Sequence, residues 1–254
     1  MADEVLTEVR DKVLLITLNR PEAMNSVNMD LALALQAAME QLDADDGLSV
    51  GVLNGNGRGF SAGMDLKAFV AGGMPNLEGR GFAGITEYSA KKPLIAAVEG
   101  FALAGGLEIA LSCDLLVAAR GAKLGIPEAG VGLFAGAGAL LRLPRRLPYG
   151  LAMKMGLTAE PILAEEAFEH GLVDELADKG GAVDAALALA ARISKNAPLG
   201  LIATKHLILE QQGRTEAEFW AYQQSHMESV FGSEDAIEGA TAFAEKRPPA
   251  WKGR

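Results

Sequence analysis

The chain has 254 residues, half of them apolar, with a formal net charge of −10 at pH 7 and a single cysteine. This composition excludes a disordered chain, an intrachain disulfide and a basic nucleic-acid surface. Residues 1–4 are acidic, unlike a signal peptide, and no apolar run approaches the roughly 18 residues of a membrane span, so we expect a cytoplasmic protein without a membrane partner.

The first part of the chain is predicted to form strands around one helix. Two β-branched or Leu-rich runs, Val5 to Arg10 and Val13 to Asn19, are separated by Asp11-Lys12 and indicate a hairpin. Apolar residues at helical spacing predict a helix from Asn28 to Asp46. A strand from Ser49 to Leu53 follows.

The middle of the chain alternates between strand and helix patterns. Residues 68–84 are rich in glycine and show little periodicity, so we expect a mobile excursion beside a ligand site. A strand from Leu94 to Val98, a helix that begins at Gly105 and a strand from Asp114 to Ala119 come next. This order is typical of an α/β layer architecture.

Beyond Gly132 helical patterns predominate. They cover a segment that ends at Leu143 and the ranges 149–156, 183–195, 199–212, 215–231 and 234–246. Pro144 and Pro148 are interpreted as breaks before the second of these helices. We predict a core domain over residues 1–195, with the ligand and catalytic site, and a helical C-terminal region over residues 196–254 for oligomerisation and completion of the site.

Two glutamates each follow a glycine signal: Glu108 in Gly105-Gly106-Leu107-Glu108, and Glu128 in Gly125-Ile126-Pro127-Glu128. A glycine pair that opens an apolar helix presents N–H groups and the positive end of the helix dipole to a ligand. The glycine loop from Asn54 to Asp65 offers a second donor, and two donors can hold an oxyanion. Each glutamate alone has an ordinary explanation, as a helix N-terminal residue or a solvated turn residue, but together they suggest one acid/base pair.

These motifs resemble the crotonase superfamily, specifically its enoyl-CoA hydratases, and most closely the actinobacterial ones. The resemblance rests on Phe60 to Lys67, on Ala104 to Glu108, and on Pro127-Glu128 followed by Gly132, in the family's order and spacing. It implies an α/β, crotonase-like fold, which is a spiral of ββα units with a helical C-terminal region. It also implies a homotrimer or a hexamer built as a dimer of trimers.

The resemblance assigns roles to individual residues. Glu108 and Glu128 would be the catalytic pair, and the backbone N–H groups of Met64 and Gly105 would form an oxyanion hole for a thioester carbonyl. The residues implied to bind substrate or CoA are Ser26, Ala62, Met64, Asp65, Leu66, Lys67 and Gly105, with Lys67 as the phosphate or ribose contact. Some members of the superfamily have a lysine that contacts CoA at the position of Glu22. In this chain that cation would be replaced by Arg20, Lys246 or Lys252.

The implied activity is that of a lyase of fatty acid metabolism, as in β-oxidation: reversible hydration of a 2-enoyl-CoA to a 3-hydroxyacyl-CoA. Coenzyme A is part of the substrate, and no separate cofactor is expected. Alternatives are an enoyl-CoA isomerase, which can operate with one glutamate, another dehydratase such as one acting on a carnitinyl thioester, and a non-catalytic binding homologue.

The two glutamates must differ in protonation state for this chemistry. A carboxylate at a helix N-terminus is biased toward ionisation, so we expect this of Glu108, whereas an apolar setting should raise the pKa of Glu128. The three histidines, His170, His206 and His226, lack metal-ligand spacing, and no metal site is predicted.

Overall fold

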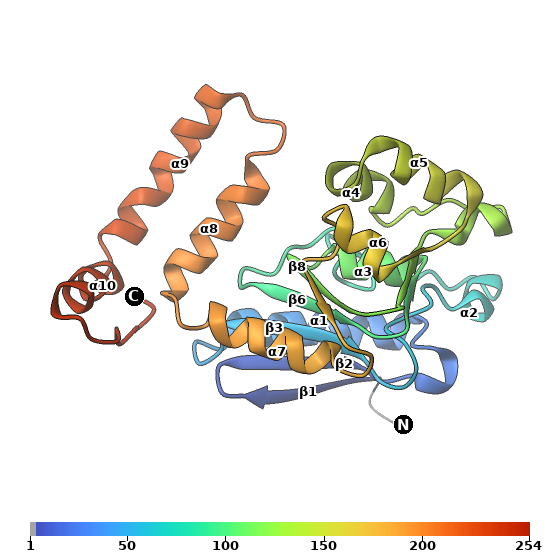
Figure 1. Cartoon of the computed structure of the whole chain (residues 1–254), viewed down its shortest axis with the longest axis horizontal. Coiled ribbons are helices and arrows are strands. Elements are labelled where there is room, and N and C mark those ends of the chain that lie inside the picture. The colour runs from blue at the N-terminus through green and yellow to red at the C-terminus, as the bar shows by residue number, and fades with distance from the viewer. Residues whose placement is uncertain (1–3) are drawn as a thin grey trace.

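A six-stranded, mostly parallel sheet forms the base of the protein (Figure 1). The computed structural model describes residues 4–254. The hairpin predicted at the start is confirmed, since β1 (Val5–Arg10) pairs antiparallel with β2 (Val13–Leu18). The other strands are parallel to β2 and follow in the order β3 (Val50–Gly55), β6 (Leu94–Val98), β8 (Leu115–Ala119) and β11 (Glu175–Ala177).

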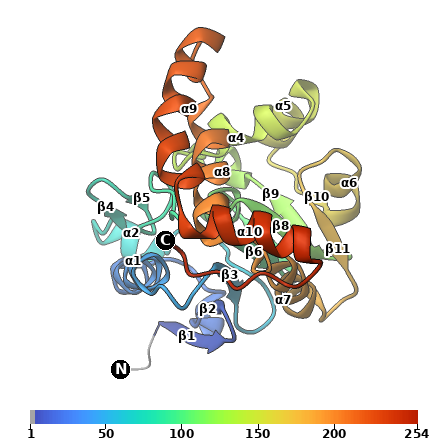
Figure 2. The ribbon, with the colours of Figure 1, turned by 90° about the vertical axis from the view of Figure 1, so that its left-hand side faces the viewer.

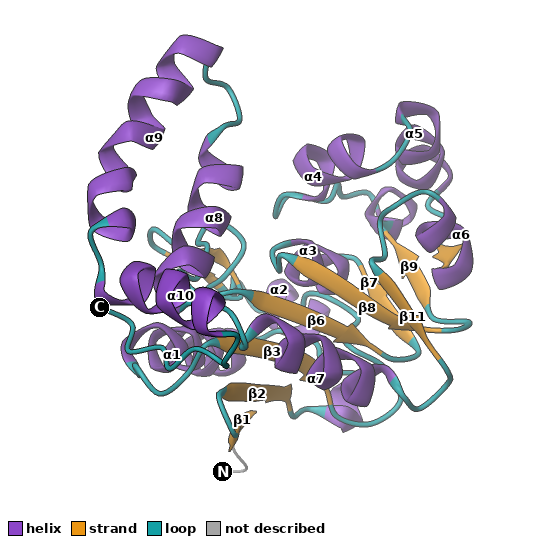
Figure 3. Cartoon of the chain, turned by 60° about the vertical axis from the view of Figure 1, so that its left-hand side comes forward, coloured by secondary structure: helices purple, strands orange, loops and turns teal. Residues whose placement is uncertain are grey.

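Both faces of this sheet are buried, which is why its strands read as nearly continuous apolar runs. In β2 the side chains of Leu14 and Ile16 enter one core cluster, whereas those of Val13 and Leu15 enter another on the opposite face. Helix α1 (Met29–Ala44) belongs to the first cluster and α7 (Ala182–Ile193) to the second. Figure 3 shows α7 lying across the sheet.

A second, smaller sheet brings distant segments of the chain into parallel register. It contains β10 (Ile162–Leu163), β9 (Lys123–Gly125) and β7 (Phe101–Leu103). Strands β7 and β9 are parallel, and Ser61 of the glycine loop makes an isolated parallel bridge with Ala102 on the other side of β7. Three segments therefore run side by side and end at the same edge.

The segment predicted to be an irregular excursion, residues 68–84, contains regular structure. Helix α2 (Leu66–Val70) begins because the Asp65 side chain accepts hydrogen bonds from Lys67 N and Ala68 N. A two-stranded hairpin, β4 (Asn76–Leu77) with β5 (Gly81–Phe82), follows. The elements are too short to leave a periodic pattern in the sequence, so the prediction missed them.

Within the described part of the chain, the core contains six further short helices. They are the 3-10 helices η1 (Pro21–Ala23) and η2 (Pro127–Val131) and the helices α3 (Gly105–Leu111), α4 (Ala139–Arg146), α5 (Tyr149–Thr158) and α6 (Ala164–Glu169). Pro144 lies inside α4, so its interpretation as a helix break is wrong. Near the end of a short helix a proline removes one backbone hydrogen bond without preventing the last turn.

The C-terminal helices extend from the core as an arm (Figures 1 and 2). They are α8 (Pro198–Glu210), α9 (Glu216–Phe231) and α10 (Glu234–Glu245), and neither α8 nor α9 has a buried residue. Lys205 joins α8 to the core, because its Nζ lies 2.7 Å from Asp114 Oδ2 and donates to Lys92 O at 2.9 Å. Among residues 4–254 no helix is both long enough and apolar enough to cross a bilayer.

Candidate active site

The two candidate glutamates meet because their strands are parallel neighbours. Strand β7 leads through Ala104 into α3, which carries Glu108, and β9 leads into η2, which carries Glu128. Ala104 N donates to Gly125 O at 2.9 Å, which holds the ends of the strands together. The two side chains lie close enough for the charge of Glu108 to raise the pKa of Glu128.

The backbone N–H groups predicted as an oxyanion hole also lie at this edge. Val27 N donates to Gly63 O at 2.8 Å and Asp65 N donates to Val27 O at 2.9 Å. Because successive N–H groups of an extended chain point in opposite directions, the N–H of Met64 points away from Val27. A Cβ on Gly63 would lie 2.7 Å from Gly105 N, so the two backbone segments are in contact.

Both of these N–H groups remain available to a ligand. Within the part of the chain that the structure describes, neither Met64 N nor Gly105 N donates to a protein acceptor. Ala104 has a φ of 52° and a ψ of −133°, a conformation that costs free energy for a residue with a side chain. This turn directs the N–H of Gly105 to the edge of the small sheet.

Phe82 forms one wall beside the second donor. A Cβ on Gly105 would lie 2.6 Å from Phe82 Cε1, so the missing side chain of the glycine makes room for the aromatic ring. The ring is only 7% exposed and belongs to the main core cluster. An apolar wall beside free N–H donors strengthens their electrostatic effect, because it excludes water.

Glu108 is a buried carboxyl held by backbone donors. Glu108 is only 3% exposed, and its Oε1 accepts hydrogen bonds from Ala137 N at 2.7 Å and from Ala139 N at 3.1 Å. Burial raises the pKa of Glu108, while the hydrogen bonds from Ala139 and Ala137 and the charge of Arg142 lower it. We expected the position of Glu108 on α3 to lower its pKa, and this expectation is wrong, because burial raises the pKa. The groups that favour the carboxylate, Ala137, Ala139 and Arg142, lie at and around the start of α4.

Glu128 has fewer groups that stabilise its charge. Burial raises its pKa to about 7, its own backbone N–H opposes the rise, and the charge of Glu108 adds to it. Its Oε2 is buried without a hydrogen-bond partner among residues 4–254. The raised pKa agrees with the prediction for Glu128, and both protonation states are accessible near neutral pH.

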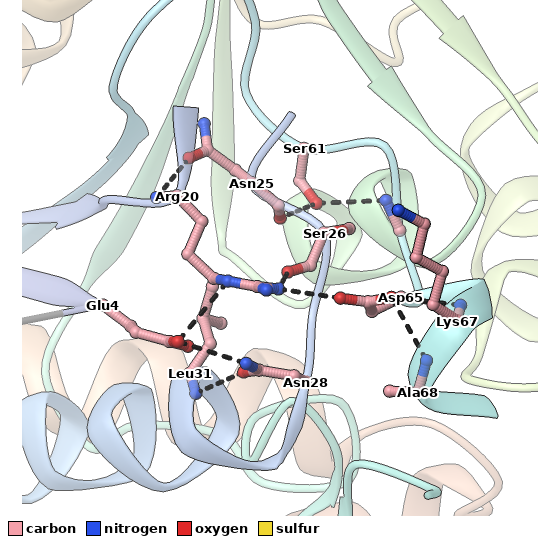
Figure 4. Close-up of polar contacts among 11 residues, drawn as sticks. Glu4, Arg20, Asn25, Ser26, Asn28, Leu31, Ser61, Asp65, Lys67 and Ala68 are labelled. Carbon is pink, nitrogen blue, oxygen red and sulfur yellow. Dashed lines mark hydrogen bonds and ion pairs between the residues drawn. The ribbon is translucent and has the colours of Figure 1, made fainter. Parts of the chain in front are cut away.

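The predicted CoA-binding segments form a hydrogen-bonded cluster around Arg20 (Figure 4). Arg20 Nη1 donates to Ser26 O at 2.5 Å and to Asp65 Oδ2 at 3.2 Å, and its Nε lies 3.5 Å from Glu4 Oε1. Its guanidinium therefore joins three parts of the protein. The suggestion that Arg20 replaces a missing CoA cation stays a prediction, and the structure adds that its guanidinium already has internal partners.

The other predicted CoA contacts differ in what they offer a ligand. The Asp65 carboxylate is occupied by Arg20 and by the first turn of α2; these hydrogen bonds lower its pKa although burial opposes them. Leu66 and Lys67 are exposed, and Ser26 and Ala62 are partly buried. Lys67 has no side-chain partner in the described part of the chain, so its charge is available. These CoA contacts stay predictions.

Asn25 shapes the site, although the sequence analysis assigned it no role. It is fully buried, and its Nδ2 donates to the carbonyl oxygens of Asn56, Gly59 and Phe60 at 2.9 to 3.0 Å. Its φ of 52° lies in the left-handed region, which asparagine tolerates better than most residues. Asn25 thus holds the glycine loop in place.

No group of three or more His, Cys, Asp or Glu side chains with the arrangement of metal ligands occurs between residues 4 and 254. The polar groups assembled here are instead two carboxyls and two N–H donors. Such a set can stabilise negative charge on a carbonyl oxygen and transfer protons beside it.

Known proteins with similar sequences and structures align with almost the whole chain. A family model described as enoyl-CoA hydratase/isomerase matches residues 8–254. The crystal structure of an enoyl-CoA hydratase from Mycobacterium tuberculosis H37Rv is 54% identical with a TM-score of 0.97, over 99% of this chain and 100% of that chain. A carnitinyl-CoA dehydratase of Salmonella enteritidis is 40% identical over 250 residues, 95% of each chain. The crystal structure of a carnitinyl-CoA hydratase from Mycobacterium avium is also 40% identical, with a TM-score of 0.81 over 100% of both chains.

Proposed function

The chain belongs to the enoyl-CoA hydratase/isomerase family, and from this premise we propose that it adds water reversibly to a 2-enoyl-CoA to form a 3-hydroxyacyl-CoA. Its α/β architecture is of the crotonase type, as the sequence predicted, and enzymes of this family act on acyl-CoA thioesters. The observation that carries the proposal is the pair of buried glutamates beside two N–H groups without a protein acceptor.

The first task of the site is to stabilise an enolate. Addition of water at C3 of the enoyl group moves negative charge onto the thioester oxygen. In the proposed complex this oxygen accepts from Met64 N–H and Gly105 N–H. Loss of one such donor typically slows a reaction by about 100- to 1000-fold.

The second task is proton transfer by the two glutamates. We assign the carboxylate of Glu108, oriented by Ala137 N and Ala139 N, as the base that takes a proton from water as the C3–O bond forms. Protonated Glu128 then delivers a proton to C2, and the pKa of about 7 supports this role at neutral pH. Return of a proton from Glu108 to Glu128 restores the site, and dehydration follows the same steps in reverse.

Water and the two carboxyl groups supply and accept all the protons that the proposed reaction moves. The proton lost by water is matched by the proton gained at C2, and no electrons are transferred. We therefore propose that the enzyme needs neither a metal ion nor a redox cofactor, and that CoA enters only as part of the substrate.

The test is an absorbance assay that follows loss of the conjugated enoyl thioester. Crotonyl-CoA and a longer 2-enoyl-CoA are supplied to the wild type, Glu108→Gln and Glu128→Gln, with Glu160→Gln as an exposed control. We expect both site variants to lose activity by about 100-fold or more while the control keeps it. Inactivity of the wild type toward every enoyl-CoA, or full activity of both site variants, would overturn the assignment.

A dehydratase acting on a carnitinyl thioester is the second candidate. It is favoured by the 40% identity to a carnitinyl-CoA dehydratase, and it too would use both glutamates. The higher identity to a mycobacterial enoyl-CoA hydratase, 54%, supports the first candidate. Competition between crotonyl-CoA and crotonobetainyl-CoA, read by product mass, distinguishes them. Conversion of a 3-enoyl-CoA by Glu108→Gln would instead indicate an isomerase.

We also propose that the chain assembles as a homotrimer or a dimer of trimers. Apolar side chains on the C-terminal arm support this, since Trp220 is 58%, Phe231 72% and Phe243 88% exposed. A hollow of about 690 Å³ between α8 and α9, lined in part by Leu207 and Phe219, adds to this open surface. Light scattering after size-exclusion chromatography tests the assembly, and a monomeric mass would contradict it.

A further inference from the structure

Arg142 links two walls of the proposed active site. It lies on α4 and is partly buried, and its Nη2 donates to Thr86 O at 2.6 Å while Nη1 donates to Ala137 O at 3.4 Å. Thr86 follows Phe82 by four residues, and its N–H donates to Phe82 O at 3.3 Å. The guanidinium therefore connects the segment that packs on Gly105 with the loop that holds Glu108.

The fit of Arg142 depends on Gly138. A Cβ on Gly138 would lie 2.1 Å from Arg142 Nη1, and the φ of Gly138 is +112°, so both space and conformation favour glycine. Gly138 stands between Ala137 and Ala139, the two residues whose N–H groups donate to Glu108 Oε1. The guanidinium thus lies directly against the backbone that binds the carboxylate.

The positive charge of Arg142 has no direct carboxylate partner within residues 4–254. A partly buried charge without an ionic partner is costly, and here the two carbonyl oxygens of Thr86 and Ala137 accept from it. Burial raises the pKa of Glu108, and the charge of Arg142 opposes that rise. Burial and the charge of Arg146 lower the pKa of Arg142, and the charge of Glu108 opposes that fall. The other charged or titratable groups that act on these two side chains are Cys113 after α3, Glu128 on η2, and Arg145 and Arg146 on α4.

We propose that Arg142 is a positioning residue for the reaction: it holds backbone 137–139 in the conformation that orients the Glu108 carboxylate, and it supplies the positive charge beside that carboxylate. It acts through Glu108 and does not touch the substrate. The inference rests on the proposed hydratase function, because it assigns Glu108 the role of base.

The test compares Arg142→Met and Arg142→Lys with Lys154→Met, which removes a positive charge from an exposed position on the neighbouring helix α5. For each variant the pH profile of kcat/KM for hydration is measured between pH 5 and 9. In Arg142→Met we expect the acidic limb to move to higher pH and kcat to fall by about 10- to 100-fold at pH 6, with KM little changed. Lys154→Met should match the wild type, and a uniform loss at every pH in Arg142→Met would indicate a merely structural role.

Two further measurements keep the inference testable apart from the activity. Carboxyl NMR titration, with Glu108→Gln to assign the signal, should show a higher midpoint for Glu108 in Arg142→Met. An unchanged midpoint overturns the inference, whereas wild-type inactivity overturns only the hydratase function. If Arg142→Met does not fold, Arg142→Lys decides. Lysine keeps the charge but has one nitrogen in place of the two that donate to Thr86 O and Ala137 O, so an unaltered kcat would contradict positioning.

Discussion

Gly63 and Gly105 meet backbone to backbone, with the site of a Gly63 Cβ only 2.7 Å from Gly105 N. The contact joins the glycine loop to the start of α3, two segments that sequence separates by some forty residues. Because Met64 follows Gly63 directly, this single contact sets the separation of the two proposed oxyanion donors. A glycine at position 63 is thus required by space as well as by its φ of +91°.

Gly63→Ala should reduce hydration by on the order of 100-fold or more, because the added methyl displaces the N–H of Gly105. Gly72→Ala is a matched control: its φ is +87°, but a Cβ there meets nothing within 4 Å. Both variants bear similar backbone strain, and only the first disturbs the donors. Comparable kcat/KM values for the two variants would show that the contact does not matter for catalysis.

Glu128→Gln should stabilise the folded protein at alkaline pH. The raised pKa of about 7, against an ordinary value of 4.5, means that the folded state binds this proton more tightly than the unfolded state. Stability therefore falls as pH rises from about 4.5 through about 7, and glutamine avoids that loss. We expect a gain of on the order of 1 to 2 kcal/mol in the free energy of unfolding at pH 8 and little change at pH 4, measured by urea denaturation.

The exposed substitution Glu160→Gln serves as the control for this measurement and should change stability little at either pH. If Glu128→Gln has the same stability as the wild type at pH 8, the carboxyl is not penalised by burial. Its assignment as the acid of the reaction would then lose its electrostatic support.

Arg20→Met should destabilise the protein by about 2 kcal/mol and raise KM for the CoA thioester. The substitution leaves Ser26 O and Asp65 Oδ2 without their donor and frees the loop that carries Met64. Arg10→Met breaks an exposed pair with Glu8 and should cost less than about 1 kcal/mol. Equal unfolding midpoints in the two variants would argue against the bracing role of Arg20.

Lys205→Met should loosen the C-terminal arm at a cost of about 3 kcal/mol, because it leaves the Asp114 carboxylate without its cation. Burial raises the pKa of Asp114 and Lys205 lowers it, so the loss of stability should grow as pH rises.

Hydrogen exchange of the Lys205→Met variant should increase in α8 and not in α7. Lys154→Met is the exposed control. The double variant Lys205→Met with Asp114→Asn removes the unpaired charge but keeps an acceptor for Leu94 N, so it should recover part of the stability, which a purely local packing defect would not allow.

Local patterns in the sequence determined most of the architecture. The apolar runs of the strands and the helical spacing of Leu31, Leu35 and Leu42 reflect which faces are buried, and the structure confirms the hairpin and α1. The glycine motifs before Glu108 and Glu128 pointed to one acid/base pair. Such features depend on neighbours within a few residues, which is why they can be read from the chain itself.

Only the tertiary structure decided the electrostatic state of the site. Glu108 receives its hydrogen bonds from residues 29 and 31 positions later, and Arg20 is paired with Asp65, 45 positions away. Burial depends on all the elements packed around a side chain, so no local pattern showed that it would outweigh the helix terminus at Glu108. The sequence by itself determined which two carboxyls meet; the packing of distant segments determined how tightly each holds its proton.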